Sequence, residues 1–124
     1  MKILLSFLQA SRSYDIPPYQ FWMHYITRGL EEAGHEWLSV PDVDWVEGLV
    51  VREGPDHESW KERSWSRTVD FARREGADLF LSYLFPWQVD ASAIKQIRAL
   101  GIPTVNFYCD NVRDFRRIPK SYAP

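Results

Sequence analysis

The chain repeats one junction three times: an amphipathic segment runs into a glycine, and the glycine runs into an apolar segment. The junctions are Gly34 before residues 35–40, Gly76 before residues 78–84 and Gly101 before residues 103–109. Glycine just past a helix adopts the left-handed backbone conformation that other residues resist, so each junction marks a helix C-terminus. With an apolar first segment at residues 2–8, the pattern predicts the order β-α-β-α-β-α-β, in which helical crossovers join parallel strands.

The predicted fold class is α/β, a Rossmann-like three-layer sandwich around a parallel sheet of about four strands. The simplest right-handed winding of these strands gives the spatial order 2-1-3-4. Residues 1–124 are long enough for one core and too short for two, which predicts a single domain. A doubly wound sheet normally continues past this point. We therefore expect the chain to be the N-terminal half of a larger enzyme, or a truncated relative of one.

The composition excludes several classes of partner. Fifteen basic and seventeen acidic residues nearly balance, so no global charge favours nucleic acid or a membrane surface. The apolar run at residues 3–8 is too short for a signal-peptide core or a membrane span. A single cysteine, Cys109, excludes an internal disulfide and fits a reducing compartment. We expect a cytoplasmic protein.

Helical periodicity predicts one buried face in each of three helices. The first helix begins near Pro17 and Pro18, and its apolar face is Phe21, Trp22, Tyr25, Ile26, Leu30 and Ala33. The second opens on a capping box at residues 59–62, and its sheet-facing residues are Trp65, Thr68, Val69 and Ala72. The third has Asp90 as N-cap, a hydrophobic staple of Val89 and Ile94, and the buried face Ile94, Ile97 and Leu100. Residues 41–55 fit either a short extra strand or a long loop folded over the sheet.

The predicted strand order places a ligand crevice at the carboxyl ends of strands one and three. Its lining comes from the polar loop at residues 9–15, the segment at residues 85–87, and Asp110 and Asn111 after strand four. The N-terminus of the first helix favours an anionic group beside the first loop, and Arg12 adds to that preference. The alternative is that Ser11, Ser13 and Asp15 only form turns and caps.

Several familiar site chemistries do not fit the sequence. Neither G-x-G-x-x-G nor G-x-x-x-x-G-K-[ST] occurs, and the acidic residues of a two-component receiver are missing after strand one. A cysteine phosphatase needs an arginine six positions after Cys109, where this chain has Phe115. The histidines His24, His35 and His57 are scattered and predict no metal site; we expect His57 to be solvated. The basic residues Arg113, Arg116, Arg117 and Lys120 are typical of a solvated tail.

Four segments carry a family resemblance that covers nearly the whole chain. They are residues 1–5 (MKILL), 29–36 (GLEEAGHE), 76–82 (GADLFLS) and 101–110 (GIPTVNFYCD). Together they resemble the N-terminal domain of GT-B glycosyltransferases, in particular the bacterial spore-maturation-type, family 1-like group. G-H-x-V and G-I-P-x-V patterns also occur in other Rossmann-like domains.

The resemblance implies that this chain binds the acceptor and that a missing C-terminal domain binds the nucleotide-sugar donor. It assigns the acceptor side to Gln9, Ser11, Arg12, Tyr14, Asp15, Tyr83, Phe85, Trp87 and Asn111. It implies that Asp110 is the catalytic base, which takes the acceptor hydroxyl proton; the alternative is that Asp110 caps a turn. Neither a metal nor another cofactor is expected.

The rival function is a free-standing flavodoxin-like module that binds a small ligand or a protein without catalysis. If the chain is half of an enzyme, we expect Tyr14, Phe85 and Trp87 to form an exposed patch that supports weak self-association.

Overall fold

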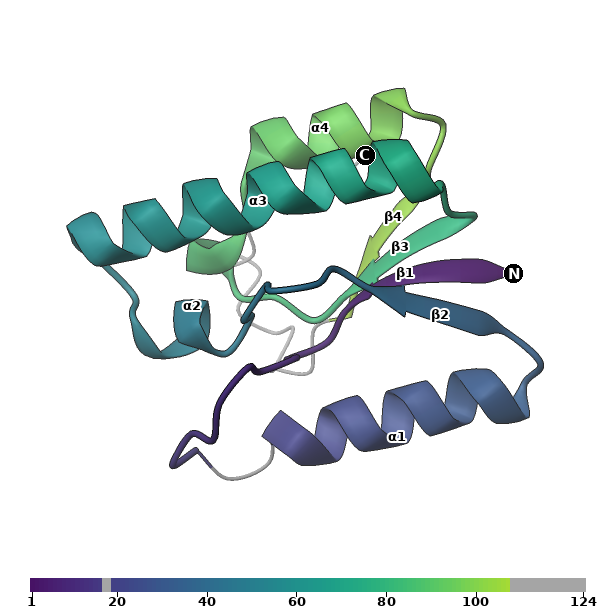
Figure 1. Cartoon of the computed structure of the whole chain (residues 1–124), viewed down its shortest axis with the longest axis horizontal. Coiled ribbons are helices and arrows are strands. Elements are labelled where there is room, and N and C mark those ends of the chain that lie inside the picture. Colours follow the sequence, from purple (N-terminus) through teal and green to yellow (C-terminus); the bar gives the residue numbers. More distant parts are fainter. Residues whose placement is uncertain (17–18, 108–124) are drawn as a thin grey trace, which may run out of the picture.

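The computed structural model describes residues 1–16 and 19–107 of the chain. These residues form three layers, with a central sheet, α1 on one face, and α3 and α4 on the other (Figure 1). The strands are β1 (Lys2–Ser6), β2 (Glu36–Ser39), β3 (Leu79–Ser82) and β4 (Thr104–Asn106). The helices are α1 (Tyr19–Glu32), α2 (Glu47–Val50), α3 (Pro55–Glu75), α4 (Ala91–Ala99) and the 3₁₀ turn η1 (Pro86–Gln88).

The sheet confirms the predicted topology. All three strand pairs are parallel, and the order is β2-β1-β3-β4. Gly34, Gly76 and Gly101 have φ values of 76°, 66° and 83°, which confirms the positive φ expected of a glycine after each helix; at Gly76 the ψ of 159° leads directly into an extended segment. The strands are shorter than the apolar segments that predict them: β1 ends at Ser6, although the following Phe7 and Leu8 are also buried.

The face of the sheet beneath α3 and α4 holds three of the six tryptophans, Trp45, Trp60 and Trp65. Trp45 makes edge contacts with Trp60 and Trp65, at ring-centroid distances of 6.0 Å and 5.3 Å. The Trp60 and Trp65 indole N–H groups donate to the carbonyl oxygens of Asp44 (2.7 Å) and Gln88 (2.8 Å). This core therefore buries large aromatic area without leaving these two indole donors unpaired.

The segment at residues 41–55 forms a loop and the short helix α2, not an extra strand. It lies against α3, where Gly48 faces the ring of Trp60 so closely that a Cβ would overlap it. The requirement at Gly48 is one of space, because the Trp60 ring occupies the volume that any side chain would need.

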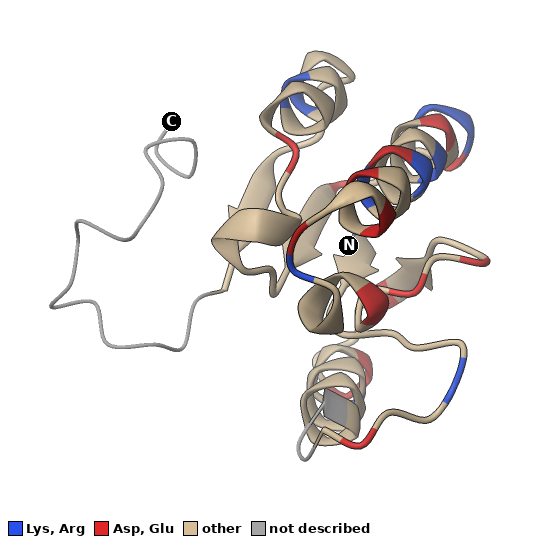
Figure 2. Cartoon of the chain, turned by 90° about the vertical axis from the view of Figure 1, so that its left-hand side faces the viewer, with Lys and Arg blue, Asp and Glu red and all other residues tan. Residues whose placement is uncertain are grey.

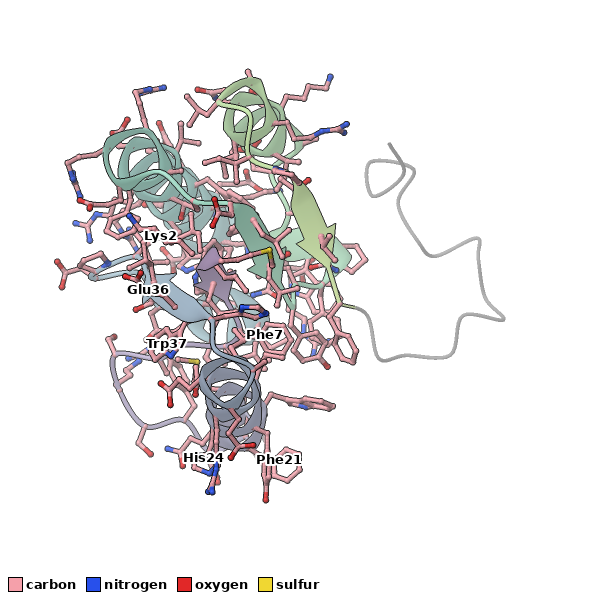
Figure 3. The ribbon with its side chains drawn as sticks, turned by 90° about the vertical axis from the view of Figure 1, so that its right-hand side faces the viewer. Lys2, Phe7, Phe21, His24, Glu36 and Trp37 are labelled. Atoms are coloured by element: carbon pink, nitrogen blue, oxygen red, sulfur yellow. The ribbon has the colours of Figure 1, made fainter. Side chains whose placement is uncertain are left out.

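Among the described helices, α1 covers the opposite face of the sheet. Trp22, Met23, Ile26 and Leu30 pack onto the cluster that contains Leu5 and Phe7. The predicted buried face of α1 was wrong at three residues. Phe21 and Tyr25 are 53% and 58% exposed, and Ala33 is also exposed. One helix buries only the narrow stripe that meets the sheet, and Phe21 and Tyr25 lie on the neighbouring stripe. Figure 3 shows Phe21 and His24 extending from α1 away from the sheet, whereas Phe7 lies between the sheet and α1.

The ends of α3 and α4 confirm some predicted details and correct others. Asp90 caps α4, accepting hydrogen bonds from the backbone N–H groups of Ser92 (2.8 Å) and Ala93 (3.0 Å). The prediction that this helix opens on a capping box at residues 59–62 was wrong. Helix α3 begins four residues earlier at Pro55, whose fixed φ suits a first helical position. Leu100 is exposed instead of buried, since it lies past the last turn of α4.

Candidate functional site

The loop that follows β1 reaches the carboxyl end of the sheet, where α2 also lies (Figure 1). It begins with Leu8 in a left-handed conformation (φ 62°), which is uncommon outside glycine. The side chain of Gln9 holds this turn: its Oε1 accepts from the Phe7 N–H (2.7 Å) and its Nε2 donates to the Leu5 carbonyl (2.9 Å). The Gln9 amide is thus engaged with backbone groups, so this predicted binding residue also shapes the loop.

Asp44 anchors the same loop, and sequence reasoning missed it. Its side chain is nearly buried (7% exposed), and Oδ2 accepts hydrogen bonds from the Ser11 N–H (2.9 Å), the Ser11 hydroxyl (2.8 Å) and the Tyr14 hydroxyl (3.0 Å). Its Oδ1 accepts from the backbone N–H of Glu47 (2.9 Å), at the start of α2. The available signal was the spacing of Asp44 and Glu47, which matches an acidic cap followed three residues later by Glu.

Arg12 extends this network to the protein surface. Its Nε donates to the Tyr14 hydroxyl at 3.0 Å, and its guanidinium carbon lies 4.9 Å from the centroid of the Tyr14 ring. Burial raises the pKa of Tyr14, and the hydrogen bond to Asp44 acts in the same direction, whereas Arg12 lowers it. Tyr14 therefore stays protonated and donates to Asp44, while Arg12 donates to Tyr14. Asp15, the last predicted site residue in the loop, is exposed.

A groove of about 610 Å³ separates this loop from the first turns of α1. Its walls are Leu8, Gln9, Ala10, Ser11, Arg12 and Ser13 from the loop, with Gln20, Met23 and His24 from α1. Figure 2 shows acidic and basic residues interleaved along α3, whereas the loop from β1 to α1 carries few charges. The predicted residues Gln9, Ser11 and Arg12 thus share one open groove.

The loop after β3 is aromatic and packed. Tyr83 is buried, with its ring centroid 5.5 Å from that of Phe7 and 5.6 Å from that of Phe85. Trp87 stacks on Phe85 (4.9 Å, 18°), lies beside the Arg52 guanidinium (4.9 Å), and donates its indole N–H to the Gly48 carbonyl (3.1 Å). The predicted exposed patch of Tyr14, Phe85 and Trp87 was wrong: all three are half-buried, because each ring packs on its neighbours. Self-association remains a prediction.

Two buried polar side chains hold the β3 loop, and the sequence analysis did not identify them as such. His57, expected to be solvated, is 3% exposed, and its ring nitrogens lie against the carbonyl oxygens of Val51 and Trp87. The Gln88 side chain accepts from the Phe85 N–H (3.0 Å) and donates to the Trp45 carbonyl (2.8 Å). A histidine on the first turn of α3 becomes buried because α2 and the β3 loop fold over it.

The short helix α2 connects the two loops. Asp44 joins the β1 loop to the N–H of Glu47, and the next residue, Gly48, accepts the hydrogen bond from Trp87 in the β3 loop. The structure therefore brings Gln9, Ser11, Arg12 and Tyr14 together in the β1 loop, and it groups Tyr83, Phe85 and Trp87 in the β3 loop. Tyr14, Tyr83 and Phe85 all pack on the apolar cluster that contains Leu5 and Phe7. Asp110 and Asn111, like Cys109, lie outside the described residues.

Within residues 1–16 and 19–107, no group of three His, Cys, Asp or Glu side chains is arranged to hold a metal ion. In the same part of the chain, no helix combines the length and apolar character needed to cross a membrane.

No protein-family model, no curated protein and no solved structure matches this chain.

Proposed function

We propose that this chain is the acceptor-binding half of a GT-B glycosyltransferase, which moves a sugar from a nucleotide-sugar donor to an acceptor hydroxyl. Two lines of reasoning support the proposal. The sequence segments described above resemble that family, and the parallel sheet has the order β2-β1-β3-β4, in which ligands bind beyond the carboxyl ends of the strands. In this proposal the donor is held by a C-terminal domain, and the enzyme works in the cytoplasm without a metal.

The observation that carries the proposal is the preformed β1 loop. Asp44 fixes Ser11 and Tyr14 before any ligand arrives, and the loop presents the Ser13 hydroxyl and the remaining N–H donors of the Arg12 guanidinium along one side of a groove. Groups fixed in this way bind a polar ligand at a lower entropic cost than flexible ones do. A hydroxyl-rich acceptor matches these donors.

Asp44 is a poor choice for the catalytic base. Its two oxygens accept four hydrogen bonds, and its side chain is nearly buried, so neither oxygen is placed to take a proton from a substrate. We therefore keep Asp110 as the proposed base, with Asn111 beside it as an acceptor contact, on the strength of the family resemblance. Removal of a positioned general base typically lowers the rate by about 10²- to 10⁴-fold.

The test uses the intact protein that carries this chain, incubated with a panel of nucleotide sugars and candidate acceptors. Released nucleoside diphosphate and the mass increase of the acceptor are the readouts. We expect Asp110→Ala to lower kcat by about 10²-fold or more, and the nearby Asp114→Ala, as matched control, to retain activity. Unchanged turnover in Asp110→Ala removes the base role. The absence of turnover with any nucleotide sugar, in a folded protein, favours the flavodoxin-like binding module instead.

A further inference from the structure

The groove between the β1 loop and α1 has one full positive charge and no acidic side chain among its lining residues. Arg12 supplies the charge, His24 on α1 is a second basic group, and Ser11, Ser13 and Gln20 supply neutral polar groups. Two carboxylates act electrostatically on Arg12: Glu47, which forms an ion pair with Arg63, and Asp44, which is turned to the interior hydrogen bonds of the loop. The groove therefore presents donors and positive charge to a ligand.

Arg12 retains most of its hydrogen-bonding capacity. A guanidinium has five N–H donors, and Tyr14 takes only the one on Nε. Among the described residues, no ion pair includes Arg12. The two terminal nitrogens form a planar fork that matches the geometry of a carboxylate or phosphate.

The loop also restrains the position of Arg12. The Tyr14 hydroxyl accepts from the Arg12 Nε and donates to Asp44, so the guanidinium is tethered to a buried carboxylate through one phenol oxygen. The same guanidinium lies near the face of the Tyr14 ring, which favours a cation. An arginine tethered in this way loses less side-chain entropy on binding than a free one.

The groove is larger than an inorganic anion needs. Its volume of about 610 Å³ falls in the usual range for small organic ligands. Buried Leu8 and half-buried Met23 form an apolar part of its wall. A ligand with an anionic end and a sugar-sized or apolar body fits this combination of charge, polarity and volume.

We propose that this groove recognises an anionic group on the acceptor, a phosphate or a carboxylate, through Arg12 assisted by His24. The inference rests on the proposed function only in calling the ligand an acceptor. The anion site itself is defined by the groove and its lining residues.

The test is a titration of the ¹⁵N-labelled chain followed by NMR, with inorganic phosphate, glucose 6-phosphate, glucuronate and glucose as separate probes. We expect glucose 6-phosphate to shift the amide signals of residues 11–13 and 20–24, and glucose to leave them unchanged. Because one charge-assisted contact is lost, Arg12→Gln weakens binding by about tenfold or more. The control Arg28→Gln removes a charge from the exposed part of α1 and leaves binding unchanged.

Each arm of the titration has a defined meaning. Response to glucuronate identifies a carboxylate ligand, and response to the phosphorylated probe alone identifies a phosphate. Equal response to glucose, or equal loss of binding in Arg12→Gln and Arg28→Gln, overturns the anion site.

The titration is independent of the proposed transferase activity. Anion binding in the groove without sugar transfer by the intact protein leaves this inference standing and removes the transferase. If the intact protein transfers sugar to neutral acceptors and Arg12→Gln leaves that activity unchanged, the proposed transferase stands and this inference is removed.

Discussion

The loops after β1 and β3 reach the same end of the sheet, yet different forces hold them. Buried aromatic rings and backbone carbonyls fix the β3 loop. From α3, His57 and Trp65 bond to the carbonyl oxygens of Trp87 and Gln88, and within the loop Trp87 stacks on Phe85. Polar side chains fix the β1 loop: the Gln9 amide holds its first turn, and the Asp44 carboxylate holds the exposed Ser11 and the half-buried Tyr14. The β3 loop thus behaves as part of the core, whereas the β1 loop is ordered and still accessible. Accessibility together with order is what a binding site needs.

The largest expected effect is in the core that supports the β3 loop. Trp65→Ala removes a fully buried ring and the hydrogen bond to the Gln88 carbonyl, and we expect a loss of about 3–5 kcal/mol in the free energy of unfolding. Urea denaturation measures it. Trp65→Phe keeps most of the packing and is expected to cost less, so equal losses in the two variants contradict this account of the site.

A substitution in α2 tests the connection between the loops. Gly48→Ala places a Cβ into the ring of Trp60, and overpacking of this kind typically costs about 1–3 kcal/mol. The matched control is Gly29→Ala, because a Cβ at this α1 position meets open space and alanine favours the helix. We expect thermal denaturation to show a lower Tm for Gly48→Ala and an equal or higher Tm for Gly29→Ala. A neutral Gly48→Ala would mean that α2 can move away from Trp60.

The polar anchor is expected to matter more for the β1 loop than for the rest of the fold. Asp44→Ala removes the acceptor of the part-buried N–H groups of Ser11 and Glu47 and of the Ser11 and Tyr14 hydroxyls, at a cost of about 1–3 kcal/mol. Hydrogen exchange should accelerate at residues 9–15 and stay slow in β3. The exposed neighbour Asp42→Asn serves as control for the loss of charge. Uniformly faster exchange across the sheet would show that Asp44 supports the whole core.

The smallest effect is expected at Tyr14. Tyr14→Phe removes one hydrogen bond to Asp44 and one from Arg12, with an expected cost of about 0.5–1.5 kcal/mol. Because burial raises the pKa of Tyr14 above its usual 10.0, the folded chain holds the phenol proton more tightly than the unfolded chain. The stabilisation that the protonated Tyr14 phenol contributes to the free energy of unfolding is complete below about pH 10 and is lost as the pH rises through the folded-state pKa.

Comparison of unfolding free energies for the wild type and Tyr14→Phe across alkaline pH measures this contribution, with the exposed Tyr25→Phe as control. A stability difference that stays constant as the pH rises contradicts the assignment.

The sequence predicted the parts of the site that depend on chain order. Once the glycine junctions define the strands, the loop at residues 9–15 must leave the carboxyl end of β1, beside the segment that leaves β3. It did not predict how those loops are held. Asp44 lies more than thirty positions along the chain from Ser11, and the hydrogen bonds between them depend on how the segment at residues 41–55 folds. For the same reason, Trp87 was predicted as an exposed ligand contact, although Gly48, Arg52 and Phe85 all contact it.

The sequence by itself determined the fold class, the strand order and the N-cap of α4, because these depend on local rules of periodicity, glycine conformation and capping. The tertiary structure alone decided which side of α1 is buried, where α3 begins, and which polar side chains are enclosed. Those outcomes depend on contacts between distant segments: a single helix on one face leaves Phe21 exposed, and α2 folded against α3 encloses His57 and Asp44. Burial depends on what lies opposite a residue in space, and a linear pattern does not specify it.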